Sequence, residues 1–171
     1  GIGHDVSRYY SKAIKMVDVA KNSGADAIKF QSFIAEKIIS KKAKKAKYQK
    51  INTNDFQESQ LEMVKKFELS FEKLRSLKKY ADKKNIEFLL SPFDIESLQL
   101  IKNLKLKKIK IPSGEINNGP FLIEIAKSKI PLIISTGMAN LNEVEECLKY
   151  ISYGLIYDKK IPITKKILQE A

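Results

Sequence analysis

The chain has 171 residues, of which 43% are hydrophobic, and this length and composition favour one folded domain over a disordered or fibrous chain. No apolar run approaches the roughly 20 residues that a membrane-spanning helix needs, so we expect no membrane segment. Lys and Arg total 32 against 20 Asp and Glu, almost all of the cations are lysines, and no base-reading motif accompanies them, so we expect no specific nucleic-acid partner.

The expected elements alternate between helix and strand. Apolar residues recur at helical spacing from Ser7 to Ser23, and Gly24 follows as a helix stop. Ser70 is a suitable N-cap, and Asn140 with Glu143 resembles a capping box. The other expected elements are strands at 27–31, 87–91, 108–111 and 131–135 and helices at 58–67, 71–84, 95–103, 121–127 and 141–151. Nearly thirty residues separate the first strand from the next helix, a length typical of functional loops.

The last three strands recur at a regular period. Leu90, Ile111 and Ile134 lie 21 and 23 residues apart, and a turn and a helix follow each of them. Repetition of a strand–helix unit predicts a parallel sheet, and the near-continuous apolar runs fit strands that are buried on both faces. In parallel architectures ligands bind at the carboxyl ends of the strands. The site is therefore expected at these ends.

Polar residues follow each of the four strands at its carboxyl end. They are Lys29 and Gln31, then Ser91, then Lys110, Ser113 and Glu115, then Ser135 and Thr136. Buried ammonium groups without a counter-charge are costly, so a phosphate or carboxylate ligand is predicted. At any single strand the simpler interpretation is turn residues with lysines that reach solvent, but recurrence at four strands favours a site. Opposite charges on Lys110 and Glu115 are expected to favour the charged form of both.

Several segments together resemble the sialic acid synthase family. They are GADAIKFQSF at 24–33, ESQLEMVKKFELS at 58–70, EFLLSPFD at 87–94, KIKIPSGEINN at 108–118 and PLIISTGM at 131–138. The similarity runs in register from about residue 3 to 150. It includes the N-acetylneuraminate, legionaminic acid and pseudaminic acid synthases, and it implies an α/β fold, a partial TIM (β/α) barrel in which parallel strands alternate with helices.

The resemblance implies a role for each matching position. By it, Lys29, Ser91, Lys110, Ser113 and Ser135 would bind phosphoenolpyruvate, with Ser91 where many members have threonine. Gln31 and Glu115 would hold an N-acylated hexosamine. A loop asparagine would also bind the sugar, and Asn54 is the best candidate, with Asn52 second. Lys29, Lys110 and Glu115 would thus form the catalytic set.

The implied reaction joins C3 of phosphoenolpyruvate to the sugar aldehyde, adds water at C2 and releases phosphate. The resemblance also implies that the full-length protein uses a divalent metal, Mn or Mg, to polarise the aldehyde and that it is a cytoplasmic homodimer. The single cysteine, Cys147, fits that reducing compartment and is expected to be a small residue on a helix.

Some family features are not found in the sequence. A metal-binding glutamate would precede the GHD turn, and two further histidines would follow, but the only histidine is His4, which is expected to be a turn residue. A full barrel needs about 250 residues. We therefore expect residues 1–171 to form a single domain, the N-terminal part of a synthase barrel, with the second barrel half, the antifreeze-like domain and the metal site absent.

Two function classes remain open at this stage. In the first, the full-length protein is a phosphoenolpyruvate-dependent synthase, and this fragment alone is inactive. In the second, the chain is a non-catalytic remnant or anion-binding module that lacks the metal site. Family histidine segments downstream would support the enzyme, whereas a stop at Ala171 would support the remnant.

Overall fold

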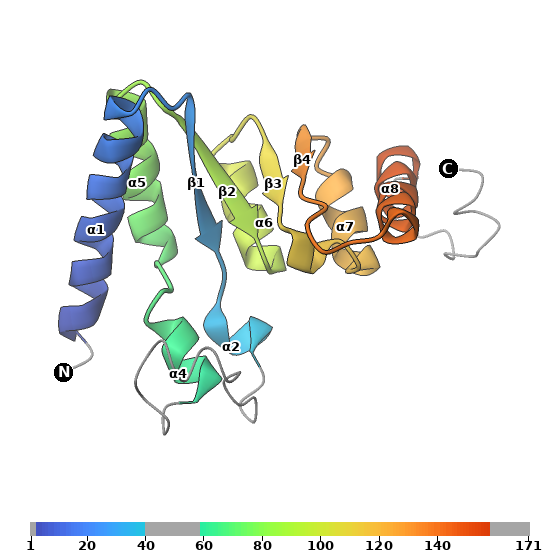
Figure 1. Cartoon of the computed structure of the whole chain (residues 1–171), viewed down its shortest axis with the longest axis horizontal. Coiled ribbons are helices and arrows are strands. Elements are labelled where there is room, and N and C mark those ends of the chain that lie inside the picture. Colours follow the sequence, from blue (N-terminus) through green and yellow to red (C-terminus); the bar gives the residue numbers. More distant parts are fainter. Residues whose placement is uncertain (1–2, 40–58, 158–171) are drawn as a thin grey trace. The chain divides into compact units, whose positions relative to one another are not determined.

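The computed structural model describes residues 3–39 and 59–157, with side chains from residue 9 onward (Figure 1). Its elements are α1 (Gly3–Asn22), β1 (Ala27–Ser32), α2 (Ala35–Ile38), α4 (Gln60–Lys65), α5 (Phe71–Lys83), β2 (Glu87–Pro92), α6 (Ile95–Asn103), β3 (Ile109–Ile111), the 3-10 turn η1 (Ser113–Glu115), α7 (Gly119–Ala126), β4 (Leu132–Ile134) and α8 (Leu141–Ile156).

The strands form one four-stranded parallel sheet in the order β1-β2-β3-β4. Leu90 of β2 pairs with Ile109 of β3, and Ile109 pairs in turn with Leu132 of β4. Sequential parallel strands alternating with helices confirm the expected partial (β/α) barrel.

The described chain divides into two compact units. The first comprises residues 1–28 and 32–88, and the second comprises residues 29–31 and 89–171. Each unit is described by itself. The expectation of a single domain over residues 1–171 stays a prediction.

The core of the first unit lies between α1 and α5. Ser70 caps α5 as expected, since its hydroxyl accepts a hydrogen bond from the backbone N–H of Lys73. Leu74, Leu77 and Ala81, the predicted apolar face of α5, are fully buried. The Asp18 carboxylate of α1 accepts a hydrogen bond from the Tyr80 hydroxyl at 2.8 Å and pairs with the Lys84 ammonium at 2.9 Å. The two helices therefore have both an apolar and a polar contact.

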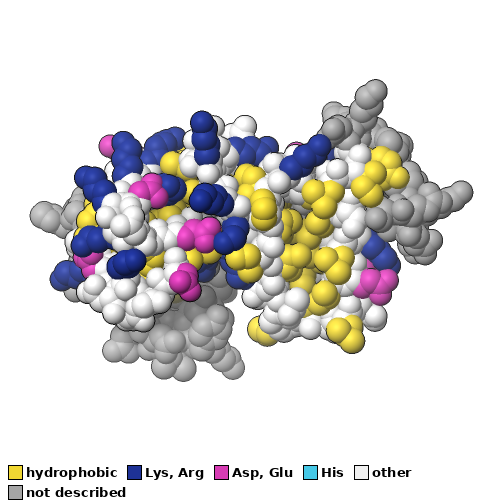
Figure 2. Space-filling model, turned by 90° about the horizontal axis from the view of Figure 1, so that it is seen from above, with side chains coloured by type: hydrophobic (Ala, Val, Ile, Leu, Met, Phe, Trp, Pro, Cys, Tyr) yellow, Lys and Arg dark blue, Asp and Glu magenta, His cyan; other side chains and the backbone are white. Residues whose placement is uncertain are grey.

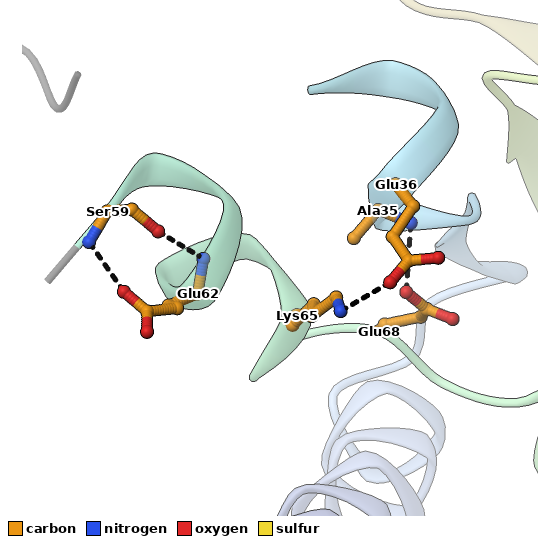
Figure 3. Close-up of polar contacts among 6 residues, drawn as sticks. All are labelled: Ala35, Glu36, Ser59, Glu62, Lys65 and Glu68. Carbon is orange, nitrogen blue, oxygen red and sulfur yellow. Dashed lines mark hydrogen bonds and ion pairs between the residues drawn. The ribbon is translucent and has the colours of Figure 1, made fainter. Parts of the chain in front are cut away.

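The short helices α2 and α4 are joined by polar contacts (Figure 3). The Lys65 ammonium lies 2.6 Å from a carboxylate oxygen of Glu36, and the Glu68 carboxylate accepts a hydrogen bond from the backbone N–H of Ala35 at 2.9 Å. Ser59 and Glu62 form a capping box at the start of α4. The sequence did not predict α2, because four residues are too few to show a helical period.

The second unit is built on α6, α7 and α8. Asp94 caps α6, and α7 is almost entirely apolar and buried. The Asn140–Glu143 capping box is present at the start of α8, which continues to Ile156 rather than ending at 151. Cys147 lies on a helix, as expected, and its burial in α8 raises the pKa of its thiol.

Carboxylates lie among the lysines on the face drawn in Figure 2. Several lysines form ion pairs within their own helix, such as Lys78 with Asp82 and Lys149 with Glu145. Surface pairs of this kind contribute little to stability. Within residues 3–39 and 59–157, no helix is long and apolar enough to cross a bilayer.

Candidate functional site

Strand register places Ser91 and Lys110 side by side on one face of the sheet. Leu90 pairs with Ile109, so one residue further along both strands Ser91 lies next to Lys110, and Lys110 pairs with Ile133. Ile109 and Ile111 are fully buried on the opposite face, whereas Lys110 is half-buried. On β1, Lys29 and Gln31 share a face, because they are two residues apart, and both are exposed.

The Lys110 ammonium has a backbone carbonyl as its partner. Its Nζ donates to the carbonyl oxygen of Ile111 at 3.0 Å. Burial, and then the positive charge of Lys29, lower the pKa of Lys110. The charge of Lys29 therefore acts on Lys110, and an anion beside Lys110 would favour its charged form.

The turns after β3 and β4 are also adjacent. The backbone N–H of Ser135 donates to the same Ile111 carbonyl at 3.0 Å. A methyl group placed on Gly137 would lie 3.8 Å from the Ser113 hydroxyl oxygen. The structure thus brings Ser113, Ser135 and Lys110 together around the end of β3.

Glu115 lies at the end of η1, where its carboxylate accepts a hydrogen bond from the side-chain amide of Asn118 at 2.7 Å. The expected mutual stabilisation of Lys110 and Glu115 is wrong for Lys110. Its pKa falls rather than rises, because burial and the like charge of Lys29 are the effects that act on it.

Ser91 has an unsatisfied polar atom in the protein interior. The residue is fully buried, and its Oγ is the one buried side-chain oxygen or nitrogen without a hydrogen-bond partner in the described part of the chain. Buried hydroxyls are normally paired, and an unpaired one costs about 1–3 kcal/mol. A ligand oxygen beside Lys110 would satisfy it.

Substitution of Ser91 by alanine tests this interpretation. Removing the unpaired hydroxyl is expected to raise the unfolding free energy without ligand by about 1 kcal/mol and to weaken anion binding by about fivefold. Chemical denaturation and phosphoenolpyruvate titration measure the two effects. Ser97→Ala, at a second fully buried serine, is the control and is expected to lower stability. Loss of stability in Ser91→Ala would contradict the interpretation.

The described residues do not fit a metal centre, since no three His, Cys, Asp or Glu side chains among them could hold an ion. Asn54 and Asn52 lie outside the described residues, and so does the side chain of His4. The roles expected for Asn54 and Asn52 stay predictions. The expectation of a turn at His4 is wrong, because its backbone lies in the first turn of α1.

Comparison with known proteins assigns the chain to a family. Residues 16–165 match the model of the NeuB family. The chain belongs to the NeuB family. It is 51% identical over 152 residues to the N,N'-diacetyllegionaminic acid synthase of Campylobacter jejuni, a match that covers 88% of this chain and 44% of that protein. The synthase of the same name from Legionella pneumophila is 44% identical over 90% of this chain and 43% of its own length.

A solved structure supports the same assignment. The N-acetylneuraminic acid synthetase of Leptospira borgpetersenii, in complex with citrate, superimposes with a TM-score of 0.70 at 28% identity, over 91% of this chain and 48% of that one. The chain therefore spans less than half the length of these NeuB relatives. These relatives are named as synthases of diacetyllegionaminic acid and N-acetylneuraminic acid, in agreement with the family that the sequence resembles.

The sequence-based reasoning did not identify Asn118 as part of this site. Asn118 precedes a Gly-Pro pair, and an asparagine before Pro in the first helical turn is a usable N-cap signal. That signal could have placed the start of α7 and shown that Asn118 lies close to Glu115.

Proposed function

We propose that the full-length protein condenses phosphoenolpyruvate with an N-acylated hexosamine to form a nonulosonic acid. The observation that carries this proposal is the row of polar strand ends, in which the unpaired hydroxyl of Ser91 lies next to Lys110. Identities of 51% and 44% to two diacetyllegionaminic acid synthases favour a diacetylated amino sugar as the acceptor.

In this proposal the residues of the second unit bind and orient phosphoenolpyruvate. Lys29 and Lys110 bind its phosphate or carboxylate as point charges, while Ser91, Ser113 and Ser135 donate hydrogen bonds. Preorganised donors of this kind stabilise the negative charge that is redistributed in the transition state. Glu115 accepts hydrogen bonds from the sugar hydroxyls, Gln31 both donates and accepts them, and Asn54 is the expected further contact.

The reaction is balanced with water as the third reactant. C3 of phosphoenolpyruvate forms a bond to the aldehyde carbon, water adds at C2, and the C–O bond to phosphate breaks. The aldehyde oxygen takes up a proton and becomes a hydroxyl. The Mn or Mg ion expected from the resemblance would polarise that aldehyde, but no step is assigned to it because the described residues do not fit a metal centre. A homodimer stays part of the proposal for the full-length protein.

A coupled assay of the full-length protein tests the function. With manganese present, phosphate release is expected only when phosphoenolpyruvate and a diacetylated hexosamine are both added, and the product mass should equal sugar plus pyruvate. The chain of residues 1–171 is expected to bind phosphoenolpyruvate weakly without turnover. Phosphate release that does not depend on the sugar, or no release with any N-acylated hexosamine, would exclude the proposed synthase activity.

A further inference from the structure

Asn118 contacts Glu115 through both its backbone and its side chain. The Asn118 side-chain amide donates to Oε2 of Glu115 at 2.7 Å, and its backbone N–H donates to the Glu115 carbonyl at 3.0 Å. Asn118 therefore fixes one carboxylate oxygen of Glu115. The other oxygen, Oε1, remains available to accept a hydrogen bond from a ligand.

Asn118 is itself attached to the core of the second unit. Its side-chain oxygen accepts from the backbone N–H of Phe121 at 3.4 Å and caps α7, in which Phe121 and Leu122 are buried. At the first residue of α7, a methyl group on Gly119 would lie 2.6 Å from the ring of Tyr150 in α8. The start of α7 is thus closely packed, which fixes the backbone next to Asn118, while the exposed Asn118 side chain is held by its hydrogen bonds to Glu115 and Phe121.

The neighbouring Asn117 makes a different contact. Its side-chain amide donates to Glu143 Oε1 at 3.1 Å, while Glu143 Oε2 accepts from the backbone N–H of Asn140 at 2.8 Å. This contact joins the turn after β3 to the capping box of α8 and does not involve the carboxylate of Glu115. Asn117 therefore offers a matched comparison for Asn118.

We propose that Asn118 is a positioning residue that orients the Glu115 carboxylate toward the sugar hydroxyls. The inference rests on the proposed function, in which Glu115 binds the sugar. A glutamate side chain has several rotamers in solution, and holding it in one of them reduces the conformational entropy lost on binding. The hydrogen bonds of Asn118 in the described part of the chain involve Glu115, Phe121 and Leu122 and neither Lys29 nor Lys110, so its effect is expected to be specific to the sugar.

Steady-state kinetics of the full-length Asn118→Ser variant test the proposal. Serine keeps an N-cap oxygen for α7 but lacks the amide donor. The KM for the sugar is expected to rise about fivefold, the size of effect expected when one more side chain must be ordered on binding, while the KM for phosphoenolpyruvate changes less than about twofold. Asn117→Ser is the control and should leave the sugar KM unchanged. Thermal melting of both variants shows whether the N-terminal caps of α7 and α8 are kept.

A double-mutant cycle separates positioning from a structural role. In a Glu115→Ala background, Asn118→Ser is expected to cause no further rise in the sugar KM, because the side chain that Asn118 orients is then absent. Additive effects, equal changes in both KM values, or an unchanged sugar KM in an active enzyme would overturn the inference alone. A wild-type enzyme without condensation activity would overturn the proposed function and this inference with it.

Discussion

Replacing Lys110 with methionine in the full-length protein is expected to raise the KM for phosphoenolpyruvate by about 10- to 100-fold. A hydrogen bond from a charged group contributes about 1.5–3 kcal/mol, and methionine removes the charge while keeping a similar apolar stem. Lys110 is half-buried beside the unpaired hydroxyl of Ser91, so water would screen its charge less than that of a surface lysine. Steady-state kinetics at saturating sugar measure the change.

The control for Lys110→Met is the exposed lysine three positions earlier in the chain. Lys107→Met removes the same charge and is expected to change the KM less than about twofold, because charges in solvent are screened. Lys29→Met should also raise the KM for phosphoenolpyruvate. Equal losses in Lys107→Met and Lys110→Met would show that diffuse positive charge, rather than a site, attracts the anion.

Lys110→Met is expected to stabilise the folded protein, although it weakens phosphoenolpyruvate binding. The folded protein lowers the pKa of Lys110, so between the folded and unfolded pKa values the unfolded chain binds more protons, and stability rises with pH across that interval. Below it, the charged lysine destabilises the folded state. Lys110→Met is therefore expected to be more stable than wild type near neutral pH, and this advantage should disappear above the ordinary lysine pKa of about 10.4. Denaturant titrations at several pH values measure it.

Replacing Gly154 with valine is expected to lower the unfolding free energy by about 3 kcal/mol. A methyl group at Gly154 would lie 2.6 Å from the backbone oxygen of Ile123 and 2.7 Å from the Cβ of Ala126, so α7 and α8 would have to separate. Alanine gains about 1 kcal/mol in helix propensity over glycine, so Gly154→Ala should cost less than Gly154→Val. Chemical denaturation measures both variants.

Glu146→Val serves as the control for Gly154→Val. Glu146 lies on the exposed face of the same helix, so this change tests the helix propensity of valine without a steric clash. Its expected cost is about 0.5 kcal/mol. A similar loss in both variants would mean that helix propensity, and not the close approach of α7 and α8, explains the effect.

The sequence by itself was sufficient for features that depend on residues close together in the chain. The caps at Ser70 and Asn140 and the apolar face of α5 follow from spacings of three and four residues, and the structure has all of them. The regular return of strand and helix also predicted the parallel sheet and placed the polar strand ends at one edge. The family followed from the same segments.

Only the tertiary structure decided which partner each polar group has. The Glu115 carboxylate accepts a hydrogen bond from Asn118 and is not a cause of the Lys110 pKa shift. That pKa is lowered by burial and by the charge of Lys29 on another strand. The close approach of α7 and α8 at Gly154 was equally invisible in the sequence. These features depend on strand register and on the packing of distant segments, which determine distances and burial, whereas local spacing determines only the helix or strand face that a residue occupies.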